Sequence, residues 1–136
     1  NFAETPFEID GIHCASVEGL LQGLKEEDPA KQLRIFGKHG FEAKRAGTKK
    51  RNQKVWRLQT VWWQGRPIEF RSTDYYQLVE RALLAKFEQN EVARIALIAT
   101  GNRQLIHDTG KSESPRTSLP ADRFVRMLQD IRQQLC

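Results

Sequence analysis

The chain has 136 residues, 39% of them hydrophobic, and its 22 lysines and arginines outnumber its 17 acidic residues to give a net charge of +5. This size and composition predict one globular domain whose core needs no metal or disulfide to hold it together. No apolar run approaches the ~20 residues that cross a bilayer, so a membrane-spanning protein is excluded. The two cysteines, Cys14 and Cys136, are too few for a disulfide framework and favour a reducing, cytoplasmic setting.

The first third of the chain predicts a small hairpin followed by helices. Apolar residues alternate on both sides of Asp10–Gly11, a dipeptide that accepts the positive φ angles of a tight turn, and this pattern predicts a β-hairpin over residues 7–14. Ser16 is a suitable N-cap for a helix from Val17 to about Asp28, whose leucines recur at helical spacing. Two further short helices are predicted over residues 30–38 and 41–46.

The middle of the chain joins a basic run to the densest aromatic patch. Residues 48–54 are basic and polar and predict an exposed loop. Residues 55–63 and 68–70 flank a Gly-Pro-containing turn and predict two strands paired as a hairpin. Trp62 and Trp63 would point to opposite faces of one strand, so one ring is expected to be exposed unless both faces are covered. An exposed ring beside the basic run could stack a nucleic-acid base, while most of these aromatics are expected in the core.

The remainder is predicted to be mainly helical. A long helix over residues 74–89 carries apolar residues on one face, and Asn90 and Gly101 are placed to cap and end a second helix over residues 91–100. A short strand at 104–107, a loop at 108–120 and a last helix at 121–135 follow. Together these elements predict a predominantly helical α+β domain over residues 1–136.

The first helix carries the polar residues best placed for chemistry. At about 100° per residue, Glu18, Gln22 and Lys25 form one stripe. Such a stripe is usually solvated surface, and Glu18 also suits the first turn through the helix dipole. The alternative is that a carboxylate and an amine face a cleft together, which is a usable pair for cleaving an N-glycosidic bond. The three histidines are too scattered to form a metal site, and no cofactor is expected.

Strings spread along most of the chain carry a more specific signal. Ser16–Val17–Glu18 is followed by Gln22 and Lys25, and the long helix contains Ala-Leu-Leu-Ala-Lys-Phe-Glu-Gln over residues 82–89. Further strings in the same order are Asn1–Phe2, Ala43–Gly47 and Leu97–Gly101. In this order and approximate spacing, the chain resembles the NADAR superfamily, also called YbiA-like.

The resemblance implies a compact, mostly helical domain that acts on N-glycosides of ribose phosphates. Activities of the superfamily include removal of ADP-ribose from modified guanine, in nucleotides or DNA, and cleavage of phosphoribosylamino-pyrimidine intermediates of riboflavin synthesis. Position by position, it implies that Glu18 and Lys25 are the catalytic pair, with Gln22 beside them as a substrate contact. Further implied substrate contacts are Asn1, Phe2, Lys44 and Arg45.

The sequence departs from the superfamily pattern in the walls of the implied pocket. Residues 110–118 replace the usual Asp-x-x-Trp-Gly motif, and Gly19–Leu20 stand where a His-Tyr pair is common. Arg71 takes the place of a familiar tryptophan, and residues 54–71 are interpreted as an inserted Trp-rich hairpin. Two tryptophans of that segment, Trp56 and Trp62, are candidate substrate contacts that could replace the lost ring.

Three functions therefore stay open from the sequence. The leading one is an N-glycosidase that removes ADP-ribose from ADP-ribosylated guanine, with the modified nucleotide or DNA as its partner. The basic run and the net positive charge favour such a phosphate-rich substrate. The alternatives are a glycosidase of the riboflavin intermediates and a non-catalytic module that binds ADP-ribose or nucleic acid.

Overall fold

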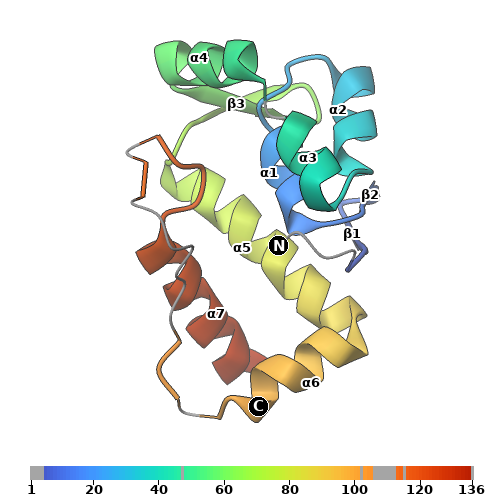
Figure 1. Cartoon of the computed structure of the whole chain (residues 1–136), viewed down its shortest axis with the longest axis vertical. Helices are drawn as coiled ribbons and strands as arrows, with labels where there is room; N and C mark the ends of the chain where they lie inside the picture. Colours follow the sequence, from blue (N-terminus) through green and yellow to red (C-terminus); the bar gives the residue numbers. More distant parts are fainter. Residues whose placement is uncertain (1–4, 47, 102, 106–112, 115, 136) are drawn as a thin grey trace.

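The computed structural model describes residues 5–46, 48–101, 103–105, 113–114 and 116–135. Within these ranges the fold is predominantly helical, with two small antiparallel hairpins, as the sequence predicts. The elements in chain order are β1 (Phe7–Ile9), β2 (Ile12–Cys14), α1 (Val17–Gly23), α2 (Pro29–Phe36), α3 (Gly40–Ala46), α4 (Lys49–Leu58), β3 (Thr60–Trp63), β4 (Arg66–Glu69), α5 (Thr73–Gln89), α6 (Glu91–Ala99) and α7 (Ala121–Leu135). Figure 1 shows α5 running diagonally through the molecule, with α1 to α4 gathered towards one end and α6 and α7 towards the other.

The hairpin β1–β2 forms as predicted and is tied to the long helix. Asp10 and Gly11 make the turn with φ angles of 51° and 80°, and Phe7 pairs with Cys14 across the ladder. The outer edge of β1 is completed by one side chain of α5: Gln89 Oε1 accepts from the Glu8 amide at 2.7 Å, and its Nε2 donates to the Glu8 carbonyl at 2.8 Å. The hairpin is thereby fixed against the C-terminal end of α5.

Helix α1 starts where predicted but is shorter than predicted. Ser16 caps it by accepting from the Gly19 amide at 2.9 Å. The α-helix ends at Gly23 and not near Asp28, and a tightened turn follows in which the Lys25 amide donates to the Gln22 carbonyl at 3.1 Å. The reason is tertiary: α2 packs directly against Gly23, where a Cβ would lie 2.3 Å from the Phe36 ring, and the Leu24 carbonyl accepts from the Trp62 amide at 2.9 Å and not from a further turn of α1.

A buried glutamine holds this end of α1 to the second hairpin. Gln32 Nε2 donates to the carbonyls of Gly23 at 3.1 Å and Trp62 at 2.6 Å, and the Trp62 amide donates to the Leu24 carbonyl at 2.9 Å. Gln32 is 2% exposed, so these bonds form away from water. The last carbonyls of α1, which a helix leaves without internal partners, are satisfied in this way.

The prediction of a basic loop over residues 48–54 and a strand over residues 55–63 is wrong in part, because Lys49–Leu58 forms helix α4. Thr48 caps the helix by accepting from the Arg51 amide at 3.2 Å, and Gln59, with a φ angle of 51°, ends it. Residues 55–59 are therefore outside the sheet, and the hairpin consists of β3 and β4 alone. Two contacts stabilise the helix. Arg51 and Lys54 form ion pairs with the turn that follows α1, and Val55 is buried, with 3% of its surface exposed. Neither contact is visible in local composition.

The C-terminal half follows the prediction closely. Helix α5 is capped by Ser72, and its buried face packs against α1, α6 and α7. Gly101, with a φ angle of 58°, follows α6 as expected, whereas the side-chain amide of Asn90 donates to the carbonyls of Pro6 and Lys86 and does not cap α6. The predicted strand at 104–107 is not formed by residues 104 and 105, and its other residues lie outside the described ranges.

Candidate active site

The polar stripe of α1 is a connected group in the folded chain. Gln22 Nε2 donates to Glu18 Oε1 at 2.9 Å, across one turn of the helix, and both residues are half-buried. Gln22 Oε1 is buried and has no hydrogen-bond partner in the described part of the chain. A buried acceptor without a partner is costly, so this carbonyl is suited to receive an N–H or O–H donor from a ligand.

Lys25 stands at the end of the same stripe, in the tightened turn after α1. Its Nζ donates to Asn52 Oδ1 of α4 at 2.8 Å. Burial lowers the pKa of Lys25 from its ordinary value, and the nearby Glu18 carboxylate acts in the opposite direction and raises it. The ammonium is therefore easier to deprotonate than that of an exposed lysine while it stays under the influence of Glu18.

Helix α4 is held against this turn by ion pairs on one side. Arg51 Nε lies 3.1 Å from Glu26 Oε1, and Lys54 Nζ lies 2.8 Å from Glu27 Oε2. These contacts set Asn52 beside Lys25. Asn52 was missed from the sequence because its segment was interpreted as a loop; Thr48, a good N-cap residue before a run of helix-forming residues, was the signal that could have revealed the helix.

Two of the predicted substrate contacts lie on α3. Lys44 and Arg45 lie in the last turn of α3, which packs against α1, and both residues are exposed. Asn1 and Phe2 lie outside the described residues. Lys44 and Arg45 are thus carried by a helix that adjoins α1.

The tryptophan-rich segment is more enclosed than expected. Trp62 and Trp63 are 6% and 7% exposed, so neither ring is exposed, and the stated exception, in which both faces of the strand are covered, is the case that occurs. Helix α4 supplies the missing cover: Lys54 Nζ lies 5.3 Å from the centre of the Trp62 ring. Trp56 is half-buried on α4, with the Arg116 guanidinium 4.8 Å from its ring centre.

Gly19 has a packing explanation. A Cβ at this position would lie 2.5 Å from the Lys38 carbonyl oxygen and 3.1 Å from that of Phe36. The segment linking α2 and α3 therefore approaches the backbone of α1 too closely for any side chain. Ser16 strengthens this contact, because its hydroxyl donates to the same Lys38 carbonyl at 2.9 Å. Close helix packing therefore explains why a glycine occupies this position.

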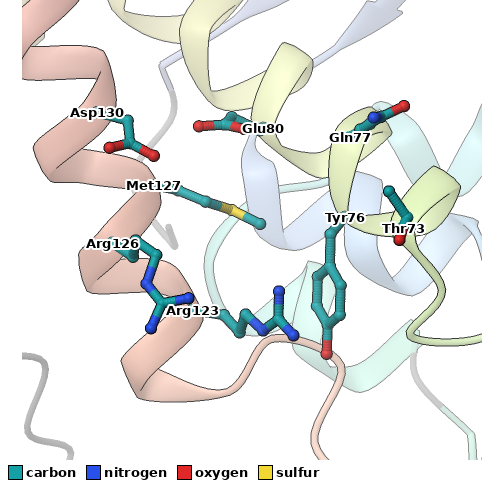
Figure 2. Close-up of a pocket in the computed structure, with 8 residues that line it drawn as sticks. All are labelled: Thr73, Tyr76, Gln77, Glu80, Arg123, Arg126, Met127 and Asp130. Carbon is teal, nitrogen blue, oxygen red and sulfur yellow. The ribbon is translucent and has the colours of Figure 1, made fainter.

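A separate pocket of about 200 Å³ lies between α5 and α7. Its lining residues are Thr73, Tyr76, Gln77, Glu80, Arg123, Arg126, Met127 and Asp130. Figure 2 shows Glu80 and Asp130 towards one end and Tyr76 with Arg123 towards the other. Burial, with a contribution from Asp130, raises the pKa of Glu80. No residue predicted from the sequence as a site residue lines this pocket.

Neither a cluster of possible metal ligands nor a helix that could span a membrane occurs in the described ranges. No three His, Cys, Asp or Glu side chains of those ranges are grouped as metal ligands would be. No helix described there is both long enough and apolar enough to cross a membrane. Burial raises the pKa of Cys14 to about 12, so this thiol stays protonated at neutral pH.

Comparisons with known proteins place the chain in a family. Residues 1–133 match the family model described as Bacteriophage protein GP30.3. The chain is 32% identical over 136 residues to a 17.1 kDa protein of the Gp30-rIII intergenic region of Enterobacteria phage T4, covering 99% of this chain and 88% of that protein. The NMR structure of the E. coli protein YbiA is similar with a TM-score of 0.69 and 24% identity, covering 99% of this chain and 75% of that one. The YbiA-like fold implied by the sequence is thus confirmed, and the chain belongs to the Bacteriophage protein GP30.3 family.

Proposed function

We propose that this chain is an N-glycosidase that hydrolyses a ribose C1′–N bond, with ADP-ribosylated guanine as its substrate. The observation that carries the proposal is the grouping of Glu18, Gln22 and Lys25, in which a carboxylate, an unpaired buried carbonyl and an amine of lowered pKa lie together. The NADAR resemblance implies this reaction class for the same positions. The reaction class rests on the site, and the choice of substrate rests on the resemblance.

Glu18 is suited to stabilise the sugar as the bond breaks. Cleavage of a C1′–N bond develops positive oxocarbenium character at C1′, and a nearby carboxylate either stabilises that charge or activates the incoming water. The hydrogen bond from Gln22 Nε2 holds one carboxylate oxygen of Glu18 and leaves the other available for this role. Glu18 is thereby oriented before the substrate arrives.

Lys25 is suited to act as a nucleophile. Its lowered pKa increases the fraction of neutral amine, the form that attacks carbon. Attack at C1′ expels guanine with a proton, and opening of the ribose ring gives an imine between C1′ and Nζ. Water then hydrolyses the imine, which releases ADP-ribose and restores the amine. Overall, one water is consumed for each bond cleaved.

The experiment measures free ADP-ribose and guanosine released from ADP-ribosyl-guanosine by liquid chromatography and mass spectrometry. We expect the unmodified chain to be active, and Glu18→Gln and Lys25→Met to be folded and to lose activity. Borohydride reduction during turnover should add a mass adduct at Lys25. Gln53→Ala, an exposed neighbour on α4, is the matched control and should keep full activity.

Each contrary outcome points to a different conclusion. No release by the unmodified chain would overturn ADP-ribosylated guanine as the substrate, and release from a phosphoribosylamino-pyrimidine would then establish the riboflavin-type activity. Binding of ADP-ribose without release from either compound would identify a non-catalytic module. Activity without a borohydride adduct would leave Glu18 as the catalytic group and remove Lys25 as the nucleophile.

A further inference from the structure

One surface of α4 carries positive charge that no described acidic residue compensates. The helix has five basic residues among its ten and no acidic residue. At about 100° per residue, Lys49, Lys50 and Arg57 fall within an arc of about 100° on its surface. All three are exposed. We call these three residues the α4 basic face.

The other side of α4 anchors the helix to the domain. Arg51 and Lys54 make the ion pairs to Glu26 and Glu27, and Val55 is buried. The two glutamates next to the helix are therefore already occupied by its inner cations. Across the described ranges, no ion pair or hydrogen bond engages the side chains of the α4 basic face.

The α4 basic face borders the candidate active site. Asn52, which accepts from Lys25 Nζ, lies about 60° around the helix from Lys49, and Trp56 lies between them. Arg116 covers the Trp56 ring and adds a further cation beside the helix. Positive charge thus extends to the helix edge that contacts Lys25.

We propose that the α4 basic face binds the sugar-phosphate backbone of a single-stranded nucleic acid and so delivers a base of that strand to Glu18 and Lys25. This inference rests on the proposed function, because it specifies the substrate of the same site. A helix of ten residues is about 15 Å long, enough to follow a short stretch of backbone. Uncompensated lysine and arginine side chains are the usual phosphate contacts, and they need no particular base.

A single strand is favoured over a duplex by the position of the amine. Lys25 is half-buried between α1 and α4, so the ribose whose C1′ it attacks must lie beside it together with the base that leaves. A base stacked in a duplex must first be flipped out, whereas a base of a single strand is already accessible. The charged face therefore binds the strand while one nucleotide turns inward.

The first test measures binding of a fluorescent, unmodified single-stranded oligonucleotide by anisotropy across a salt series. The triple variant Lys49→Gln, Lys50→Gln, Arg57→Gln is compared with Arg34→Gln, Arg103→Gln, Arg126→Gln, which removes the same charge from exposed positions elsewhere. We expect the first variant alone to bind more weakly, with the slope of log K against log salt reduced by about 0.7 for each phosphate that is no longer neutralised. Equal affinities and slopes in the two triple variants would overturn the inference. So would polyglutamate competing as well as the oligonucleotide.

The second test separates this inference from the proposed function. Release of ADP-ribose is measured from ADP-ribosyl-guanosine and from an oligonucleotide that carries one ADP-ribosylated guanine. We expect the α4 triple variant to keep its rate on the nucleoside and to show a raised KM on the oligonucleotide. Equal losses on both would contradict the inference, while no release from either by the unmodified chain would count against the proposed function and leave the binding test decisive for the α4 basic face.

Discussion

Lys25 and Asn52 join two elements through one hydrogen bond of 2.8 Å between Nζ and Oδ1. The lysine lies in the turn that ends α1, and the asparagine lies on α4, which the sequence alone does not predict as a helix. The position of Nζ, the proposed nucleophile, therefore depends on a contact between segments 27 residues apart. If Lys25 is the nucleophile, as proposed, Asn52 is a positioning residue for it.

Changing Asn52 should alter how Lys25 titrates. In Asn52→Asp the new carboxylate stabilises the ammonium, so the pKa of Lys25 rises and the rising limb of the rate profile, where Lys25 loses its proton to become the neutral nucleophile, moves to higher pH. Asn52→Ala removes the acceptor and should lower kcat with little change in KM. The measurement is kcat against pH for both variants, with Gln53→Ala as the control. An unchanged profile in Asn52→Asp would show that the contact does not influence the amine.

The charged form of Lys25 should destabilise the folded chain. Burial lowers its pKa, so between that lowered pKa and the ordinary value of 10.5 the folded chain binds fewer protons than the unfolded chain, and stability rises with pH across this window. Lys25→Met should remove that rise and leave the midpoint of unfolding at neutral pH unchanged or higher. Urea unfolding from neutral to alkaline pH tests this. A marked loss of stability in Lys25→Met at neutral pH would contradict it.

Gln32→Ala should weaken the link between α1 and the second hairpin. It removes a donor to the Trp62 carbonyl in a buried setting, whereas the Gly23 carbonyl still accepts from the Glu26 amide. Leaving a buried acceptor without a partner costs about 1–3 kcal/mol, so the free energy of unfolding should fall by about that amount. Leu33→Ala, at the next position and 55% exposed, is the control and should change it little. Equal effects of the two substitutions on urea unfolding would argue against this role for Gln32.

Two glycines of the same region should respond oppositely to alanine. A Cβ at Gly19 meets the Lys38 carbonyl oxygen at 2.5 Å, whereas a Cβ at Gly37 finds its nearest atom at 3.5 Å. Gly19→Ala should therefore destabilise the fold by about 1–3 kcal/mol, the range for overpacking. Gly37→Ala should be neutral or slightly stabilising, because it restricts the unfolded chain. Thermal unfolding of both variants decides whether close approach explains Gly19.

The carboxylates between α5 and α7 should make stability depend on acid pH. Burial and the proximity of Asp130 raise the pKa of Glu80 above its ordinary value of 4.5. In the window between the ordinary and the raised pKa the folded chain binds more protons, so stability falls as pH rises through it. Asp130→Asn should reduce that fall. Unfolding midpoints measured across weakly acidic pH test the effect, with Asp122→Asn as an exposed control on the same helix.

Much of the fold could be predicted because its signals are local. The Asp10–Gly11 turn, the Ser16 cap and the Gly101 helix end all depend on the conformations that single residues favour. The contact between Glu18 and Gln22 follows from a separation of four residues on a helix. Each of these features can therefore be predicted from a short stretch of sequence.

The parts that were missed depend on contacts between distant segments. Residues 48–54 contain no apolar residue, and their helix depends on Glu26, Glu27 and the burial of Val55. Once α4 covers the hairpin, Trp62 and Trp63 are both enclosed. The early end of α1 likewise depends on the Phe36 ring. Asn52 could not be assigned to the site before α4 was known.

The pairing of Gln89 with Glu8 has a consequence for how the chain is made. Both backbone groups of Glu8 are satisfied by a side chain 81 residues further along, so the outer edge of β1 stays open until α5 has been synthesised to its end. An open strand edge is a template for pairing with another chain. The edge of the nascent hairpin is therefore open to pairing with another chain until Gln89 has been synthesised, and this one side chain closes it.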